Sequence, residues 1–225
     1  MVFSSKIGKK MFEEDDLPED GDVYGFHELR SKGTLEEPGL VSFWKDYKNR
    51  VLRVEFPCVR DFLNETAKSI INFNREDEGI PKEERKPIKL FVHSEGGALE
   101  DVLAFVDIAS LSVTPIWTYN IGYAWSGGFV LLLLGEKRFT LKNSTALLHQ
   151  GSMSGGGEQT YGQVQEDAKN YAKRMKVMED FVLSRTKITK QLYAQKRRTE
   201  WYMNAEEQVK YGVVDKIIES IDELF

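Results

Sequence analysis

Hydrophobic and polar residues follow one another along the chain in a pattern that predicts strands separated by helices. VLRVEF (51–56) alternates apolar and polar residues as a half-buried strand does, and IKLFVHS (88–94) and IWTYNIG (116–122) are typical of buried strands. Apolar residues recur at three and four positions in 59–73 and 98–112, which predicts helices. Strands that alternate with helices at these spacings indicate an α/β domain with a largely parallel sheet.

The second half of the chain continues this pattern. SGGFVLLLL (126–134) fits a helix or a strand, and we favour a helix because the run follows a tight glycine-rich turn. KRFTLKNSTALLHQ contains one or two strands, and a shorter helix starts near Thr189. A long helix of mixed charge is predicted at 163–184. Because much of its surface is polar, it either projects into solvent or packs against another subunit.

The first 40 residues differ in composition from the rest. They are polar and acidic and contain two prolines and several glycines, which predicts an extended arm that is partly disordered or ordered only against a partner. We therefore predict an arm at 1–40 and one domain at 41–225, whose folded core begins near Val51. With 225 residues, 41% of them hydrophobic, the chain can bury one sizeable core.

Charge and cysteine content narrow the function classes. The net charge of −5 argues against binding to nucleic acid or to an anionic membrane surface. The single cysteine, Cys58, excludes an internal disulfide and a cysteine-cluster metal site, and we expect no metal or cofactor. No apolar segment follows the cationic N-terminus, and the longest apolar run, 129–134, is too short to cross a bilayer. We therefore expect a cytoplasmic protein.

Two side chains are candidates for nucleophilic catalysis. Ser126 stands among small residues in GYAWSGG, where a sharp turn after a strand would expose its hydroxyl and the next helix would aim N–H groups at developing negative charge. His149 ends the apolar run TALLH beside a glycine loop, which puts an imidazole base at a sheet edge. His93 also ends a strand and competes with it, although it more plausibly shapes the turn that follows. His27 lies in the arm.

Two further features would complete such a site. Gly96 and Gly97 follow a buried strand, and backbone N–H groups beside glycine can approach an oxyanion closely. An acid is needed to orient the histidine, and Glu200 is one of many candidates.

Taken together, these segments resemble the Clp protease family over roughly residues 50–218. FVHSEGGALEDVLAFVDI is similar to the family's strand–glycine–helix segment, and GYAWSGGFVLLLLGEKRFTLKNSTALLHQ to the stretch that carries its nucleophile and histidine. WYMNAEEQVKYGVVDKII resembles the family's closing segment. The resemblance implies a crotonase-like fold of stacked βαβ units with a protruding handle helix at 163–184.

The resemblance also implies roles for individual residues. Ser126 matches the nucleophile, His149 the base and Glu200 the orienting acid, while the N–H groups of Gly97 and Gly127 match the oxyanion donors. The segment that begins with Gly151, Ser152, Met153 and Ser154 matches the strand that pairs with an extended peptide. The function implied is that of a serine endopeptidase acting on unfolded polypeptides. The resemblance also implies that its subunits form a homo-oligomeric ring, or two stacked rings, with an AAA+ unfoldase as partner.

The chain departs from the family pattern at several positions. Glu200 stands where the family has aspartate, and Glu95 and Gly151 replace prolines. The acidic arm does not resemble the family's axial loops. A catalytically degenerate ring subunit is therefore an alternative, as are a Ser–Lys signal-peptide-peptidase relative using Lys137 or Lys142 and an acyl-CoA enzyme on the same fold.

Overall fold

The computed structural model describes residues 38–55, 57–151 and 158–224, and the chain divides into two units, Met1–Lys48 and Asn49–Phe225. The described part of the first unit is helix α2 (Pro38–Lys48), in which the rings of Phe43, Trp44 and Tyr47 contact one another. The sequence interpretation did not predict this helix. The predicted arm up to residue 37 lies outside the described residues, and the boundary after residue 40 stays a prediction.

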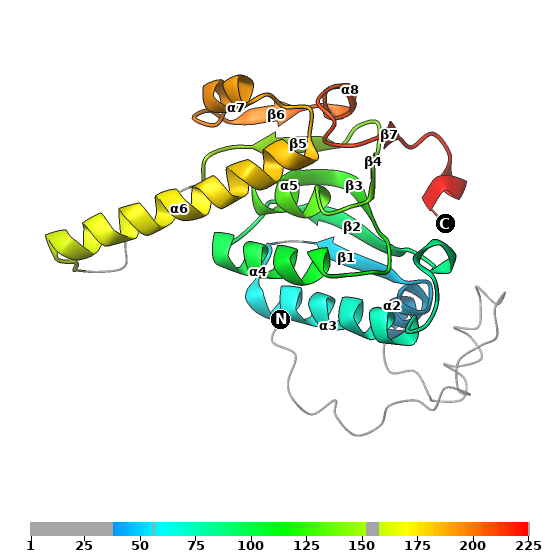
Figure 1. The fold of residues 1–225 in the computed structure, drawn as a ribbon. Helices are drawn as coiled ribbons and strands as arrows, with labels where there is room; N and C mark the ends of the chain where they lie inside the picture. The colour runs from blue at the N-terminus through cyan, green and yellow to red at the C-terminus, as the bar shows by residue number, and fades with distance from the viewer. Residues whose placement is uncertain (1–37, 56, 152–157, 225) are drawn as a thin grey trace. The chain divides into compact units, whose positions relative to one another are not determined.

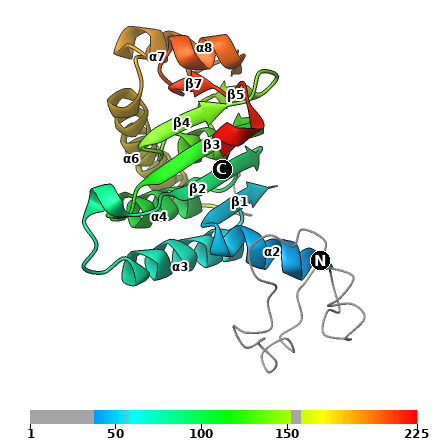
Figure 2. The ribbon, with the colours of Figure 1, turned by 90° about the vertical axis from the view of Figure 1, so that its right-hand side faces the viewer.

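The second unit is built on one mixed but largely parallel sheet, which confirms the predicted fold class. Its strands are β1 (Val51–Glu55), β2 (Ile88–Ser94), β3 (Ile116–Trp125), β4 (Lys137–Thr140), β5 (Thr145–Leu148), β6 (Trp201–Met203) and β7 (Lys216–Ile217). The order β1-β2-β3-β4-β7 is parallel throughout, and only β5 with β6 is antiparallel. Figure 2 shows β1 to β4 side by side.

Strand β3 divides the sheet into two branches and is three residues longer than predicted. Its first half pairs with β4, and its last three residues pair with β5. At the division, the fully buried Asn120 donates from Nδ2 to the Thr145 carbonyl (3.0 Å) and to Gln208 Oε1 (3.1 Å). These bonds hold the end of β3 beside β5, where the two strands carry Ser126 and His149 at their ends.

Helices α3 (Arg60–Glu76) and α4 (Leu99–Ser110) confirm the predicted amphipathic segments and lie beside each other next to the sheet (Figure 1). Helix α5 (Gly127–Leu132) confirms the preference for a helix over a strand. Every residue of α5 is buried, so all of its faces must be apolar and the sequence shows no helical periodicity.

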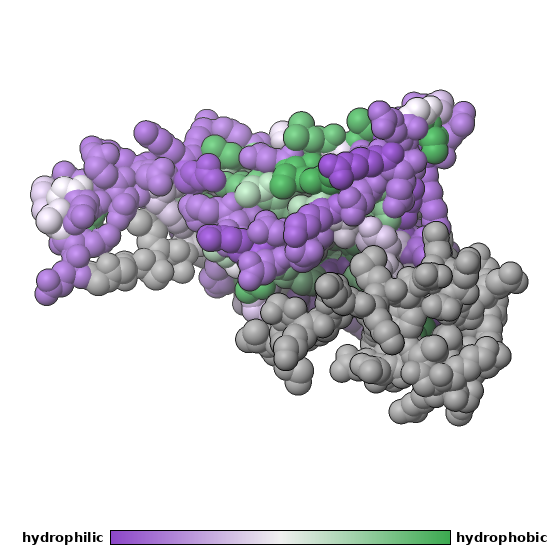
Figure 3. Space-filling model, turned by 90° about the horizontal axis from the view of Figure 1, so that it is seen from below, coloured by the Kyte–Doolittle hydropathy of each residue, from purple (hydrophilic) through white to green (hydrophobic). Residues whose placement is uncertain are grey.

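The long helix α6 (Tyr161–Arg185) confirms the helix predicted at 163–184. Its N-terminal half projects beyond the sheet and is mostly hydrophilic at its surface (Figures 1 and 3), while Met175, Met178 and Val182 near its base are buried. Arg185 then donates to the carbonyls of Leu133 (3.0 Å) and Leu134 (2.6 Å), just beyond the end of α5. Since unsatisfied carbonyls at a helix end attract cations, Arg185 ties α6 to α5.

The remaining elements complete the second unit. They are η2 (Lys82–Glu84), α7 (Lys190–Lys196), α8 (Ala205–Lys210) and η3 (Ile221–Leu224). Helix α7 begins after Thr189, whose hydroxyl accepts from the Leu192 N–H, as an N-cap residue does. None of the helices in the described part of the chain is long and apolar enough to span a membrane.

Candidate active site

Ser126 occupies the turn between β3 and α5 in a strained backbone conformation. Its φ of 52° and ψ of −115° lie in a region that non-glycine residues rarely adopt, at a cost of about 1–3 kcal/mol. The turn is fixed on both sides, because the Ser126 N–H donates to the Leu147 carbonyl of β5 (3.0 Å) and the buried α5 follows at once. Such a turn presents a serine hydroxyl at a sheet edge.

The turn after β2 is held against this serine by a small buried network. Gly96 has φ of 101°, its N–H donates to Ser94 Oγ (3.1 Å), and its carbonyl accepts from the Cys58 N–H (2.7 Å). The Cys58 Sγ lies 3.3 Å from Ser94 Oγ. Burial raises the pKa of the Cys58 thiol, so it stays neutral and serves as a small packing group.

These two turns bring Gly97 and Gly127 together. A Cβ placed on Gly127 would lie 3.1 Å from the Gly97 nitrogen, and one on Gly96 would lie 2.5 Å from the Gly127 nitrogen. Among the described residues, the N–H groups of Gly97 and Gly127 have no protein acceptor. Two unused N–H groups therefore lie beside Ser126, where an oxyanion would need donors.

His149 follows β5, and Glu200 comes immediately before the antiparallel partner strand β6. The His149 Nδ1 lies 2.9 Å from Glu200 Oε1, and the exposed fractions of the two side chains are 27% and 56%. The backbone next to His149 is also fixed, because the Gln150 N–H donates to the Arg197 carbonyl (2.8 Å). With a proton on Nδ1 directed at the carboxylate, the lone pair of the imidazole is at Nε2.

The His149 Nε2 is buried and has no hydrogen-bond partner among the described residues. It therefore makes no hydrogen bond to Ser126 Oγ in this structure. Such contacts often form only when substrate is bound.

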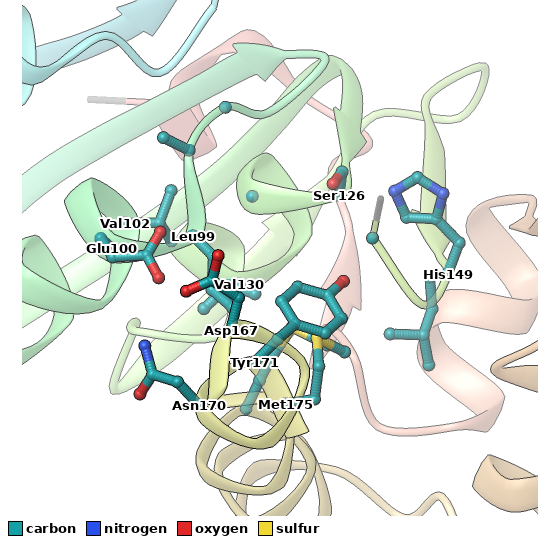
Figure 4. A pocket seen from close by; sticks show the side chains of 16 residues that line it. Leu99, Glu100, Val102, Ser126, Val130, His149, Asp167, Asn170, Tyr171 and Met175 are labelled. Atoms are coloured by element: carbon teal, nitrogen blue, oxygen red, sulfur yellow. The ribbon is translucent and has the colours of Figure 1, made fainter. Parts of the chain in front are cut away.

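One pocket of about 480 Å³ joins the predicted residues (Figure 4). Ser126, Gly127, Gly97, His149 and Gly151 all line it, whereas Glu200, which contacts His149 through Nδ1, does not. The other predicted substrate-binding residues, Ser152, Met153 and Ser154, lie outside the described residues.

The competing candidates lie elsewhere. His93 packs on Gly122, where a Cβ would be 2.8 Å from its Nε2, and its ring is 4.3 Å from that of Tyr123. Lys137 lies over the Trp117 ring at 4.4 Å, and neither it nor Lys142 lines the pocket. In the described part of the chain, no three His, Cys, Asp or Glu side chains are grouped as metal ligands.

The sequence interpretation missed one wall of this pocket. Helix α6 contributes Asp167, Asn170, Tyr171, Met175 and Met178, and α4 contributes Glu100. The spacing of Met175, Met178 and Val182 was the available signal, because three apolar residues at helical intervals on a charged helix mark a buried stripe.

Comparison with known proteins agrees with this architecture. Residues 65–221 match the Clp protease family, so the chain belongs to that family, whose members are peptidases. This confirms the resemblance drawn from the sequence.

Three curated relatives bear the same kind of name. An "ATP-dependent Clp protease proteolytic subunit" of Deinococcus radiodurans is 28% identical over 178 residues, covering 78% of this chain and 83% of the relative. The protein with this name from Streptococcus mutans is 28% identical over 176 residues (77% and 86%). "ATP-dependent Clp protease proteolytic subunit 1" of Streptomyces avermitilis is 30% identical over 145 residues (64% and 66%).

Proposed function

We propose that this protein is a serine endopeptidase that hydrolyses peptide bonds in unfolded polypeptides. The observation that carries the proposal is that one pocket is lined both by a serine in a strained turn and by a histidine. The Nδ1 of this histidine contacts a carboxylate, which leaves Nε2 to act as a base. Membership of the Clp protease family supports the same reaction class.

In the proposed reaction, Ser126 Oγ attacks the scissile carbonyl carbon while His149 Nε2 accepts the hydroxyl proton. Glu200 keeps the other imidazole proton on Nδ1 and stabilises the imidazolium. The C–N bond then breaks, the amine leaves with the proton from His149, and an acyl-serine ester remains. A water molecule activated by the same imidazole hydrolyses this ester.

The tetrahedral oxyanion would accept hydrogen bonds from the N–H groups of Gly97 and Gly127. Support comes from their closeness to each other and from their lack of other acceptors among the described residues. The segment that begins at Gly151, of which residues 152–157 lie outside the described residues, would pair with the extended substrate and hold its backbone across the pocket.

We further propose that the subunits form a ring, with two rings stacked through α6. Support comes from the projecting half of this helix, where Tyr161 is 78% exposed and Val164 49% exposed. The "ATP-dependent" names of the relatives suggest an AAA+ unfoldase as partner and, with the composition, a cytoplasmic location.

Hydrolysis of a fluorogenic peptide tests the proposed function. We expect Ser126→Ala and His149→Ala each to lower kcat on the order of 10⁶-fold, because the residues act as a unit. Measurable hydrolysis by Ser126→Ala would contradict the proposal. An assembled wild-type ring with no hydrolysis at all would instead favour a catalytically degenerate subunit.

A further inference from the structure

The end of the pocket away from His149 is acidic. Glu100 on α4 and Asp167 on α6 line it, and no lysine or arginine is among the residues that do. Figure 4 shows both carboxylates on the side of the pocket away from His149. A bound side chain that reaches this end from Ser126 therefore meets negative charge.

These two carboxylates differ from their neighbours on the same helices. Asp101 pairs with Arg60 at 2.8 Å and Glu166 with Lys169 at 2.7 Å, whereas within the described ranges neither Glu100 nor Asp167 has a cationic partner. Gln159 donates to Asp167 Oδ2 (2.7 Å), and this neutral bond leaves the charge uncompensated. The acids that line the pocket are thus the ones that no cation of the described chain neutralises.

The pocket is also lined by apolar groups, among them Val102, Val130, Met175 and Met178. Such a lining suits the methylene stem of a long side chain whose charged head lies beyond it. An aspartate or glutamate side chain would meet repulsion here, and a short apolar one would leave the carboxylates unpaired.

A polar group without a partner lies between the two ends. The Tyr171 hydroxyl is buried and makes no hydrogen bond to any described residue, and Figure 4 shows its ring in the middle of the pocket. A Cβ on Gly151 would lie 3.1 Å from this hydroxyl, so glycine, where the family has proline, leaves room beside it. A buried hydroxyl without a protein partner is a group that a ligand can satisfy.

We infer that this pocket selects substrates with lysine or arginine at the residue whose carbonyl is attacked. The stem lies along Val130 and Met175, the cation meets Glu100 and Asp167, and the Tyr171 hydroxyl accepts a hydrogen bond from it. The inference rests on the proposed function for which bond is cut, but the recognition itself is a property of the pocket.

Binding to Ser126→Ala protein tests the selection separately from catalysis. Two fluorescent peptides are compared that differ only in having lysine or norleucine at this position. Because both side chains are unbranched methylene chains of similar length, the difference in affinity reports the effect of the charge. We expect the lysine peptide to bind roughly two- to thirtyfold more tightly, the range for two exposed ion pairs, and the advantage to shrink in 1 M salt. Equal affinities would overturn the inference.

Substitution of Glu100 and Asp167 tests whether these two acids cause the preference for the lysine peptide. In the Ser126→Ala background, we expect Glu100→Gln with Asp167→Asn to remove the lysine preference and leave norleucine binding unchanged. Glu166→Gln, which removes one charge from α6 outside the pocket, should keep the preference. An unchanged preference in the double variant would also overturn the inference. If the wild-type protein cleaves neither peptide, the proposed function fails while the binding result still decides the selection.

Discussion

Replacing Gly97 with alanine should disable catalysis without unfolding the protein. The added Cβ would lie 2.3 Å from the Cys58 carbonyl oxygen, whereas ordinary contacts begin at 3.4 Å, so these two backbone segments must separate by 1.1 Å. That shift moves the Gly97 N–H away from the oxyanion position. Loss of one oxyanion donor costs about 10²–10³-fold in kcat, and a misplacement of about 1 Å has a similar cost. We therefore expect kcat to fall by roughly 10²–10³-fold with KM little changed.

The assay is steady-state hydrolysis of a fluorogenic peptide, with circular dichroism and sedimentation to establish that the variant is folded and assembled. Gly162→Ala is the matched control. Gly162 is the second residue of α6, and a Cβ there would meet nothing within 4 Å. The control should keep full activity and gain up to about 1 kcal/mol of stability. A folded, assembled Gly97→Ala protein with wild-type kcat would refute the assignment of this N–H.

Three further changes test other parts of the site and fold. Glu200→Gln should lower kcat by up to about 10⁴-fold, because an amide favours the wrong tautomer of His149; kcat within a factor of three of wild type would remove Glu200 from the mechanism. Arg50 contacts the buried Asp77 carboxylate at 2.6 and 2.7 Å, and Arg50→Met leaves this carboxylate without its cation. We expect the free energy of unfolding, measured in urea, to fall by about 3–5 kcal/mol. A fall below 1 kcal/mol would contradict this. The hydrogen bond from Arg50 lowers the pKa of Asp77, so this contribution is present above the usual carboxyl pKa of about 4 and is lost as the pH falls through the lowered folded value; an Asp77→Asn variant should lose less stability over that acid range. Ser94→Ala removes the acceptor of a buried N–H and should cost about 1–3 kcal/mol, with a lower kcat; unchanged values of both would show that the network is dispensable.

The strands and helices of the second unit were largely readable from the sequence. Local patterns were enough to predict a helix where burial on one side makes apolar residues recur at helical intervals, as in the amphipathic α3. They were also enough where burial is complete, as in the wholly apolar α5. Helix α2 was missed because it follows a segment whose composition indicates an extended arm. The extension of β3 to Trp125 was missed because it depends on pairing with β5, a contact distant in sequence.

The site was predictable only in part. Ser126, His149 and the glycine turns carry signals in their immediate sequence, and the structure brings them to one pocket. Glu200 carries no such local signal, since it reaches His149 only through the antiparallel pairing of β5 with β6. The acidic end of the pocket could not be predicted for a different reason. Glu100 and Asp167 look like ordinary surface acids until α4 and α6 are seen to face the same pocket.

Mapping of covalent labelling tests the central claim most directly. The wild-type protein would be treated with a fluorophosphonate probe, digested and analysed by mass spectrometry, with Ser126→Ala alongside. We expect one modified site, Ser126, in the wild-type protein and no modification in the variant. Labelling of a different serine, or equal labelling of the variant, would contradict the assignment of Ser126 as the nucleophile.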